Sequence, residues 1–133
     1  MTNLKTVQTF LGHVFTGEME KALALISDEA IFISVSPVAN DANPMLGTFH
    51  GKSGAQVFFT AFADVLEPGD FETSDAFADG RHVAMYGHFK HKVRATGKPY
   101  PSDWAMIAKV EDGLLTYYHF YEDSAALIEA STA

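Results

Sequence analysis

The C-terminal part of the chain holds the residue types that proton-transfer chemistry needs. His119, Tyr121 and Asp123 follow one another at two-residue steps. Because alternate side chains of a β-strand point to the same face, a strand here would place all three together. A carboxyl group in apolar surroundings can act as an acid or base near neutral pH, and a nearby histidine can share its proton. We therefore predict Asp123 and His119 as catalytic residues.

A hairpin turn at Asp112-Gly113 would bring the preceding strand beside these residues. Asp-Gly between alternating segments is a strong hairpin signal. A turn centred there pairs Trp104 with Tyr121 and Met106 with His119 on one face. The same face would hold two further pairs, Ala108 with Tyr117 and Ser102 with Asp123. The opposite face would hold Asp103, Ala105, Ile107, Lys109, Tyr118, Phe120 and Glu122, and a shift of one residue would exchange the faces.

The predicted face would form one wall of a small-molecule pocket. Such sites are mainly apolar and carry a few converging polar groups. Tyr86 and His88 share a face of the neighbouring strand, with His91 on its other face, and phenylalanines of two helices would supply the roof. The predicted substrate-binding residues are Trp104, Met106, Tyr117, Tyr121, Tyr86, His88, Phe58, Phe62 and Phe10.

Structural roles remain open for the same residues. Asp123 could cap a helical turn that begins at Ser124, and His119 could be a hydrogen-bonded histidine of the core. For Trp104 and the phenylalanines, the simplest interpretation is that they pack in the core. His88 and His91 would lie on opposite faces of a strand, so we expect no shared metal, and the absence of nucleotide-binding motifs leads us to expect no cofactor.

The pattern along the chain predicts three helices, four long antiparallel strands and two shorter strands. Apolar stripes indicate helices at 2–16, 18–26 and 53–66, and a helical turn at 124–132. A strand at 30–36 precedes a loop at 38–52 that contains a short strand at 48–50. The strands 71–78, 82–94, 103–110 and 114–123 form a meander. We expect an α+β fold in which a strongly curved sheet covers three helices.

Composition restricts the protein class. The chain has 133 residues, which predicts a single domain over 1–133. It has no cysteine, which favours a cytoplasmic location, and its N-terminus has no secretory pattern. No apolar run is long enough to span a membrane, so we expect no membrane partner. The net charge of −8 argues against a nucleic-acid partner.

This element order resembles the SnoaL-like branch of the nuclear-transport-factor-2-like (ketosteroid-isomerase-like) superfamily. The similar segments are Gly47-Thr-Phe-His-Gly51 before the third helix and the run from Trp104 through Asp112-Gly113 to Tyr121-Glu-Asp123. The resemblance implies a cone-shaped, antiparallel or mixed sheet wrapped around three helices. The superfamily includes isomerases, polyketide cyclases, dehydratases, epoxide hydrolases and non-catalytic binders, so the fold alone does not select a reaction.

The chain departs from several enzymes of that superfamily. It lacks the first-helix tyrosine and first-strand aspartate of ketosteroid isomerases, and neither Arg81 nor Arg94 is placed for the Asp-Arg-Asp relay of the epoxide hydrolases. The resemblance to the cyclases and dehydratases implies a cofactor-independent isomerase, cyclase or dehydratase acting on a hydrophobic, carbonyl-bearing molecule. The alternative is a non-catalytic ligand-binding or assembly module.

The outer sheet face predicts a homodimer. On the assigned register, Ala105, Ile107, Tyr118 and Phe120 would expose apolar area there. A second copy of the chain would cover that area.

Overall fold

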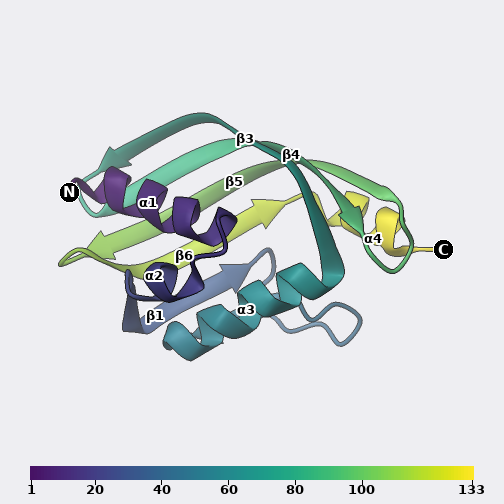
Figure 1. Ribbon diagram of the computed structural model, residues 1–133, viewed down its shortest axis with the longest axis horizontal. Coiled ribbons are helices and arrows are strands. Elements are labelled where there is room, and N and C mark those ends of the chain that lie inside the picture. Colours follow the sequence, from purple (N-terminus) through teal and green to yellow (C-terminus); the bar gives the residue numbers. More distant parts are fainter.

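The computed structural model describes all 133 residues as four helices and one six-stranded sheet (Figure 1). The helices are α1 (Asn3–Phe15), α2 (Met19–Leu23), α3 (Gly51–Val65) and α4 (Ser124–Ser131). The strands are β1 (Ile26–Ser34), β2 (Gly47–His50), β3 (Leu66–Asp79), β4 (His82–Val93), β5 (Pro99–Glu111) and β6 (Leu114–Glu122).

The sheet is mixed and open, and it curves around three of the helices. Its strand order is β2-β1-β6-β5-β4-β3, in which β1 and β6 run parallel and all other neighbours run antiparallel. Figure 1 shows α1, α2 and α3 on one side of the sheet, with α4 beyond its end. The predicted α+β class and curved sheet are confirmed.

Several element boundaries differ from the predicted ones; β1, for example, begins at Ile26, where the sequence predicted the end of a helix. α3 begins at Gly51, where φ is +69° and a Cβ would lie 2.7 Å from the carbonyl oxygen of Asp28. β3 begins at Leu66, before the predicted start at residue 71, and includes Pro68 and Gly69 at a bulge, which it tolerates because it is an edge strand. β5 begins at Pro99, four residues before its predicted start. The segment of β5 that precedes Trp104 has no partner on β6, so its prolines interrupt no hydrogen-bond ladder on the β6 side.

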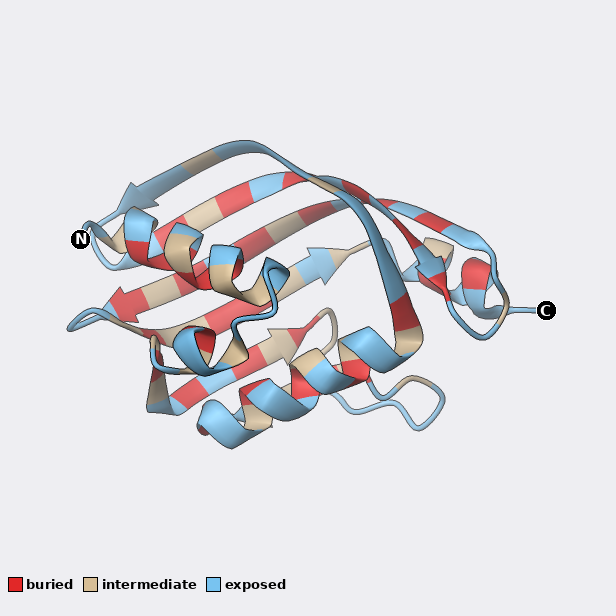
Figure 2. Cartoon of the chain, viewed as in Figure 1, coloured by how far each residue is buried: buried red, intermediate tan, exposed pale blue.

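Alternation along β4 and β5 defines which face of the sheet contacts the helices (Figure 2). On β5 the buried residues are Tyr100, Ser102, Trp104, Met106, Ala108 and Val110. On β4 they are Val83, Met85, Gly87, Phe89, His91 and Val93. The residues between them are exposed or partly exposed, so these two rows lie on the concave face.

A bulge in the β5–β6 hairpin changes the predicted register. Next to the turn, Val110 pairs with Leu115, as a turn centred on Asp112-Gly113 requires. The register then shifts, and Lys109 pairs with Tyr117. β6 therefore contains one residue more than the predicted pairing allowed.

This extra residue inverts the two faces of β6. Trp104 pairs with Glu122 and Met106 pairs with Phe120. The concave face of β6 is consequently formed by Tyr118, Phe120 and Glu122. The outer face carries Tyr117, His119 and Tyr121, so the predicted common face of these residues with Trp104 and Met106 is wrong.

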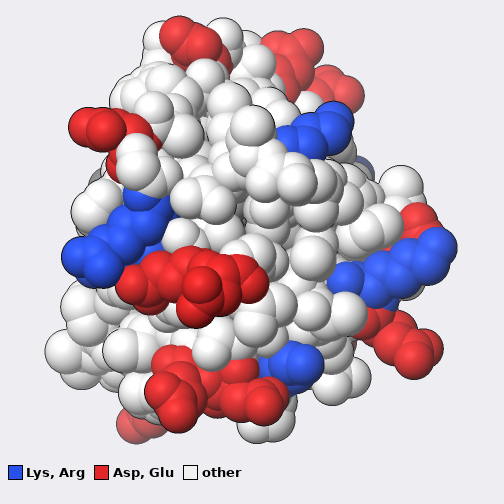
Figure 3. Space-filling model, turned by 90° about the vertical axis from the view of Figure 1, so that its left-hand side faces the viewer, with Lys and Arg blue, Asp and Glu red and all other residues white.

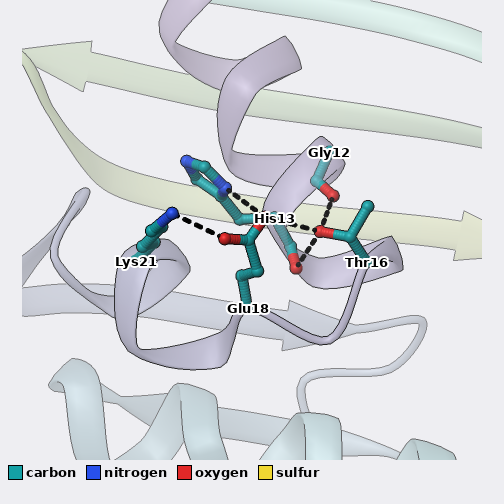
Figure 4. A network of polar contacts seen from close by, with 5 residues as sticks. All are labelled: Gly12, His13, Thr16, Glu18 and Lys21. Atoms are coloured by element: carbon teal, nitrogen blue, oxygen red, sulfur yellow. Dashed lines mark hydrogen bonds and ion pairs between the residues drawn. The ribbon is translucent and has the colours of Figure 1, made fainter.

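A polar network fixes the angle between α1 and α2 (Figure 4). Gly17, with φ of +77°, follows the end of α1. The Thr16 hydroxyl lies 2.9 Å from the Gly12 carbonyl oxygen and 3.1 Å from Oε1 of Glu18. Lys21 Nζ lies 2.6 Å from Oε2 of Glu18, and this hydrogen bond is the main reason that the pKa of Glu18 is lowered. The network holds α2 against the end of α1.

The surface carries charges of both signs. On the face in Figure 3, basic and acidic groups lie beside one another without a continuous basic area. Arg81 pairs with Glu111 at 3.0 Å across the ends of two hairpins. None of the helices combines the length and the apolar character that crossing a bilayer requires.

Candidate functional site

Aromatic side chains cover most of the concave face. Trp104 stacks on Phe71 and Phe120, with ring centroids 4.7 and 5.4 Å apart. Deeper in the fold, Tyr118 stacks on Phe32 at 4.7 Å, and Phe10 of α1 meets both rings at an angle. These rings pack against one another, and Trp104, Phe32 and Tyr118 are buried among them.

Five of the predicted binding residues belong to this side of the sheet. Phe10, Phe58, Trp104 and Met106 are buried in the core. Phe62 is partly exposed, and its ring meets that of His91 edge-on at 5.6 Å. These residues occupy the predicted positions, and their contact with a ligand stays a prediction.

The concave face contains one carboxyl group, that of Glu122. It lies at the end of β6, and the buried Tyr100 of β5 donates a hydrogen bond from its hydroxyl to Oε2 of Glu122. Burial raises the pKa of Glu122 to about 6, although the Tyr100 hydrogen bond opposes the rise. Burial, assisted by the charge of Glu122, raises the pKa of Tyr100 as well. A carboxyl group in this condition can take up or release a proton near neutral pH.

Ser102 fixes the backbone beside Glu122. Its Oγ accepts a hydrogen bond from the Asp123 N–H at 2.9 Å and donates to the Asp103 carbonyl oxygen at 2.7 Å. The end of β6 is thereby held to β5, so the Glu122 side chain projects from an anchored position.

Three other polar side chains of the concave side each have one atom without a hydrogen-bond partner in the protein, namely Oγ of Ser34, Oη of Tyr118 and Nε2 of His91. Ser34, Tyr118 and His91 are only 2%, 3% and 4% exposed. No fully enclosed side-chain nitrogen or oxygen of the chain lacks a partner, so the free Oγ, Oη and Nε2 atoms of these residues contact solvent-accessible space. Buried polar groups are normally paired, and these atoms are available to a ligand.

The orientation of His91 is set by the β3 bulge. The Gly69 N–H donates to Nδ1 of His91 at 3.0 Å, so Nδ1 carries a lone pair and the proton resides on Nε2. The imidazole stacks on Phe89 at 4.3 Å. Burial lowers the pKa of His91 to about 4, which keeps the ring neutral at physiological pH.

The partial exposure of several residues shows where the concave face meets solvent. Phe120 and Glu122 are partly exposed, as is Phe71 of β3, whereas Phe32 and Met106 are buried. The aromatic surface is therefore accessible at the end that carries Glu122.

His119 has a structural position on the outer face. Its Nε2–H donates to the Val35 carbonyl oxygen at 3.1 Å, so Nδ1 accepts from the Tyr117 hydroxyl at 3.2 Å. Its ring stacks on Tyr121 at 3.8 Å. Val35 has φ of +59°, and His119 thus holds an unusual backbone position at the end of β1. The interpretation of His119 as a hydrogen-bonded histidine is confirmed.

Asp123 is exposed and caps α4. Its side chain accepts a hydrogen bond from the Ala126 N–H at 3.1 Å, which confirms the capping interpretation. It lies one residue beyond Glu122, outside the strand that would have aligned it with His119. No hydrogen bond joins these two side chains, so the predicted catalytic pair is not assembled. Whether either residue acts on a ligand stays a prediction.

The other predicted binding residues also lie on the outer face. Tyr86 and Tyr121 are 48% and 42% exposed. His88 Nε2 lies 2.5 Å from Oε2 of Glu72. Tyr86 is on the same face of β4 as His88 and lies opposite Ala105 of β5. Tyr117 lies beneath Lys109, whose Nζ is 5.3 Å from the ring centroid. Placing these four residues in the pocket was wrong, because they alternate with the concave rows.

A surface hollow contains His88 together with Asp123. It has a volume of about 640 Å³ and is lined by Asp70, Glu72, His88, Phe89, Lys90, Pro101, Ser102, Asp103 and Asp123. Its lining is mostly charged, unlike the aromatic concave face. Its residues form no cluster of three or more groups arranged to hold a metal ion.

Sequence and structure comparisons identify similar proteins. The family model described as a SnoaL-like domain matches residues 7–118. Patulin synthesis protein F of Aspergillus clavatus is 31% identical over 107 residues, which cover 75% of this chain and 54% of that protein. The chain thus spans about half the length of this curated relative.

Two solved structures illustrate the likeness in fold. An NTF2-like protein of Burkholderia xenovorans has a TM-score of 0.85 and 22% identity, covering 98% of this chain and 95% of the other. A SnoaL-like polyketide cyclase of Mesorhizobium loti, described as putative, has a TM-score of 0.70 and 19% identity, covering 91% and 99%. At these identities the likeness establishes the fold alone.

Proposed function

The chain belongs to the SnoaL-like domain family, and on this premise we propose that it binds a small hydrophobic molecule on its concave face and transfers a proton on it. Glu122 is the proposed acid or base. Trp104, Phe71 and Phe120 are the proposed stacking surface. The Tyr100–Glu122 hydrogen bond beside this surface is the observation that carries the proposal.

The chemistry begins with removal of a proton from a carbon next to a carbonyl group. The Glu122 carboxylate accepts this proton, and the Tyr100 hydroxyl holds the carboxylate in place. Return of the proton at another carbon isomerises the molecule, and its transfer from Glu122 to a departing β-hydroxyl group releases water and leaves a carbon–carbon double bond. Attack of the carbanion on a second carbonyl cyclises it. These three reactions share the first step.

The relative's name supports a role in small-molecule biosynthesis. Patulin synthesis protein F is named for the making of a small molecule, and the chain matches about half of it. We propose the same broad setting for this chain, in the cytoplasm.

The first step can be tested without knowledge of the natural substrate. The probe is 2-tetralone, a flat ketone with exchangeable protons beside its carbonyl, incubated with the protein in D₂O and followed by NMR. We expect the protein to accelerate deuterium incorporation, and Glu122→Gln to lower the protein-dependent rate by roughly 10²- to 10⁴-fold. Asp123→Asn is the matched control, because it changes the adjacent carboxyl group and preserves the cap of α4.

The outcomes separate the candidate functions. Loss of exchange in Asp123→Asn but not in Glu122→Gln would restore Asp123 as the base. Binding of the ketone without acceleration of exchange would favour the non-catalytic binding module. This second function is favoured by the structural roles of His119 and Asp123, which leave no second acid–base pair.

We also propose a homodimer formed through the outer sheet face. Ile107 and Ala105 lie there as predicted, but Tyr118 and Phe120 do not. Tyr117 and Tyr121 take their places, so the face remains rich in exposed apolar and aromatic area.

A further inference from the structure

The concave face provides no positive charge to a ligand. Of the nine Lys and Arg side chains, eight are exposed and the ninth, Lys109, is partly buried on the outer face against Tyr117. The one charged group of the concave face is the carboxyl group of Glu122. An anionic ligand would lose its hydration without gaining a counter-charge, and Glu122 would repel it.

His91 imposes a second requirement. Because Gly69 N–H occupies Nδ1, the neutral ring presents an N–H at Nε2 and can only donate there. The hydroxyl groups of Ser34 and Tyr118 can donate or accept, so they do not discriminate. His91 is 4% exposed, and its free N–H keeps some contact with accessible space. A ligand that fills this space must offer an acceptor to His91 or leave the N–H unpaired, which is costly.

We infer that His91 is a specificity-determining residue that donates a hydrogen bond from Nε2–H to the carbonyl oxygen of a neutral ligand. The inference rests on the proposed function, since it concerns the same concave face. It narrows the ligand class to uncharged, flat, carbonyl-bearing molecules and excludes carboxylates.

An amine is the main competing ligand. The aromatic rings and the Glu122 carboxylate would attract a cation. A quaternary ammonium group, however, has no acceptor for His91 Nε2–H. The two ligand classes therefore make opposite demands on His91.

Two substitutions of His91 separate its two nitrogen positions. His91→Asn places an amide oxygen near the position of Nδ1, which preserves an acceptor for Gly69 N–H and removes the donor at Nε2. His91→Gln extends the amide toward the position of Nε2 and can restore a donor there. Loss of ketone binding in His91→Asn and its recovery in His91→Gln would identify the Nε2 donor as the group that matters. If His91 served only to hold Gly69, His91→Asn should instead be the better tolerated variant.

The experiment measures binding of four probes to the full chain by titration calorimetry. They are 1-tetralone, the hydrocarbon tetralin, tetralin-1-carboxylate and benzyltrimethylammonium. We expect 1-tetralone to bind about tenfold more tightly than tetralin, the gain of one hydrogen bond, and the carboxylate to bind most weakly. In His91→Asn the preference for the ketone over tetralin should fall to about twofold or less, and His91→Gln should recover part of it. The infrared C=O stretch of bound 1-tetralone should shift upward in His91→Asn, because the hydrogen bond is lost.

Each result has a distinct meaning. Equal binding of 1-tetralone and tetralin, or an unchanged preference and C=O stretch in His91→Asn, would overturn the role of His91 and leave the proposed function in place. Tightest binding by benzyltrimethylammonium would overturn the carbonyl class in favour of a cation. Failure of every probe to bind would overturn the proposed function itself, and the inference with it.

Discussion

Replacing Glu122 with glutamine should stabilise the fold at alkaline pH. The substitution removes the ionisable group from the concave face and retains an oxygen that can accept the Tyr100 hydroxyl. At low pH the wild-type side chain is protonated and neutral, so the two proteins should differ little. At high pH only the wild type must keep a charge in apolar surroundings, and this difference favours the variant.

The size of the effect follows from the pKa of Glu122. Burial raises it from 4.5 to about 6, so the neutral form is favoured in the folded protein. The stability that protonated Glu122 contributes is fully present below pH 4.5 and is lost as the pH rises through about 6. At 1.36 kcal/mol per pKa unit, the full loss is about 2 kcal/mol, and partial exposure of the carboxylate reduces it toward about 1 kcal/mol.

Urea unfolding from about pH 4 to about pH 8 measures this difference. The chain has a single tryptophan, Trp104, which is buried next to Glu122 and gives a fluorescence signal for unfolding. Subtracting the free energy of unfolding of the wild type from that of Glu122→Gln at each pH cancels the contribution of the other titrating groups. Glu129→Gln, at an exposed position of α4, is the control for removing a carboxyl group outside the concave face.

A flat difference for Glu122→Gln across this range would refute the reasoning, because it would mean that Glu122 is solvated as in the unfolded chain. A difference that favours the wild type more strongly as the pH rises would show instead that the carboxylate is stabilised by partners.

Three other outcomes are expected. Phe10→Ala should lower the free energy of unfolding by about 3 to 5 kcal/mol in urea titrations, since the ring is fully buried between α1 and the sheet; a loss below about 1 kcal/mol would contradict its place in the core. Asp123→Ala should cost about 1 kcal/mol through loss of the α4 cap and Asp123→Asn should cost little, and equal thermal stability of both variants and wild type would argue against the cap. Light scattering should give twice 14.5 kDa for the wild type and a smaller mass for Ile107→Glu on the outer face; a wild-type mass of one chain would reject the dimer.

Most of the fold could be predicted because local signals agree with it. The apolar stripe that contains Phe10 predicts α1, and the Asp-Gly pairs at 79–80 and 112–113 mark two of the hairpins that the structure shows. These features depend on neighbouring residues alone, so one sequence is enough to identify them.

The site could not be predicted in the same way, because the two faces of β6 look alike in sequence. Tyr117, His119 and Tyr121 form one alternating set, and Tyr118, Phe120 and Glu122 form the other; each is rich in aromatic rings and holds a single imidazole or carboxyl group. The hydrophobic pattern therefore does not determine the register of β6. The bulge determines it, and the bulge depends on the pairing of β6 with both β5 and β1.

The sequence did not identify Tyr100 and His91 as residues of the candidate site. Tyr100 lies between two prolines, which favoured a turn over a strand. The alternation correctly places His91 on the face opposite Tyr86 and His88, but it does not show that the face of His91 is the concave one. The sequence does contain a clue, because Tyr100 and Ser102 alternate with Trp104 and would share its face on a longer strand. The clue identifies them only once β5 is known to begin at Pro99.

The β5–β6 bulge has a consequence for comparing members of this family. Deleting one residue of β6 beside the hairpin turn would rotate the rest of the strand and exchange Tyr118, Phe120 and Glu122 for Tyr117, His119 and Tyr121. The same residues would then offer a ligand an imidazole in place of a carboxyl group. Two relatives that differ by one residue at this point could share almost every amino acid of β6 and yet present different reactive groups. Active-site residues can therefore be transferred between such proteins only after their bulges have been aligned.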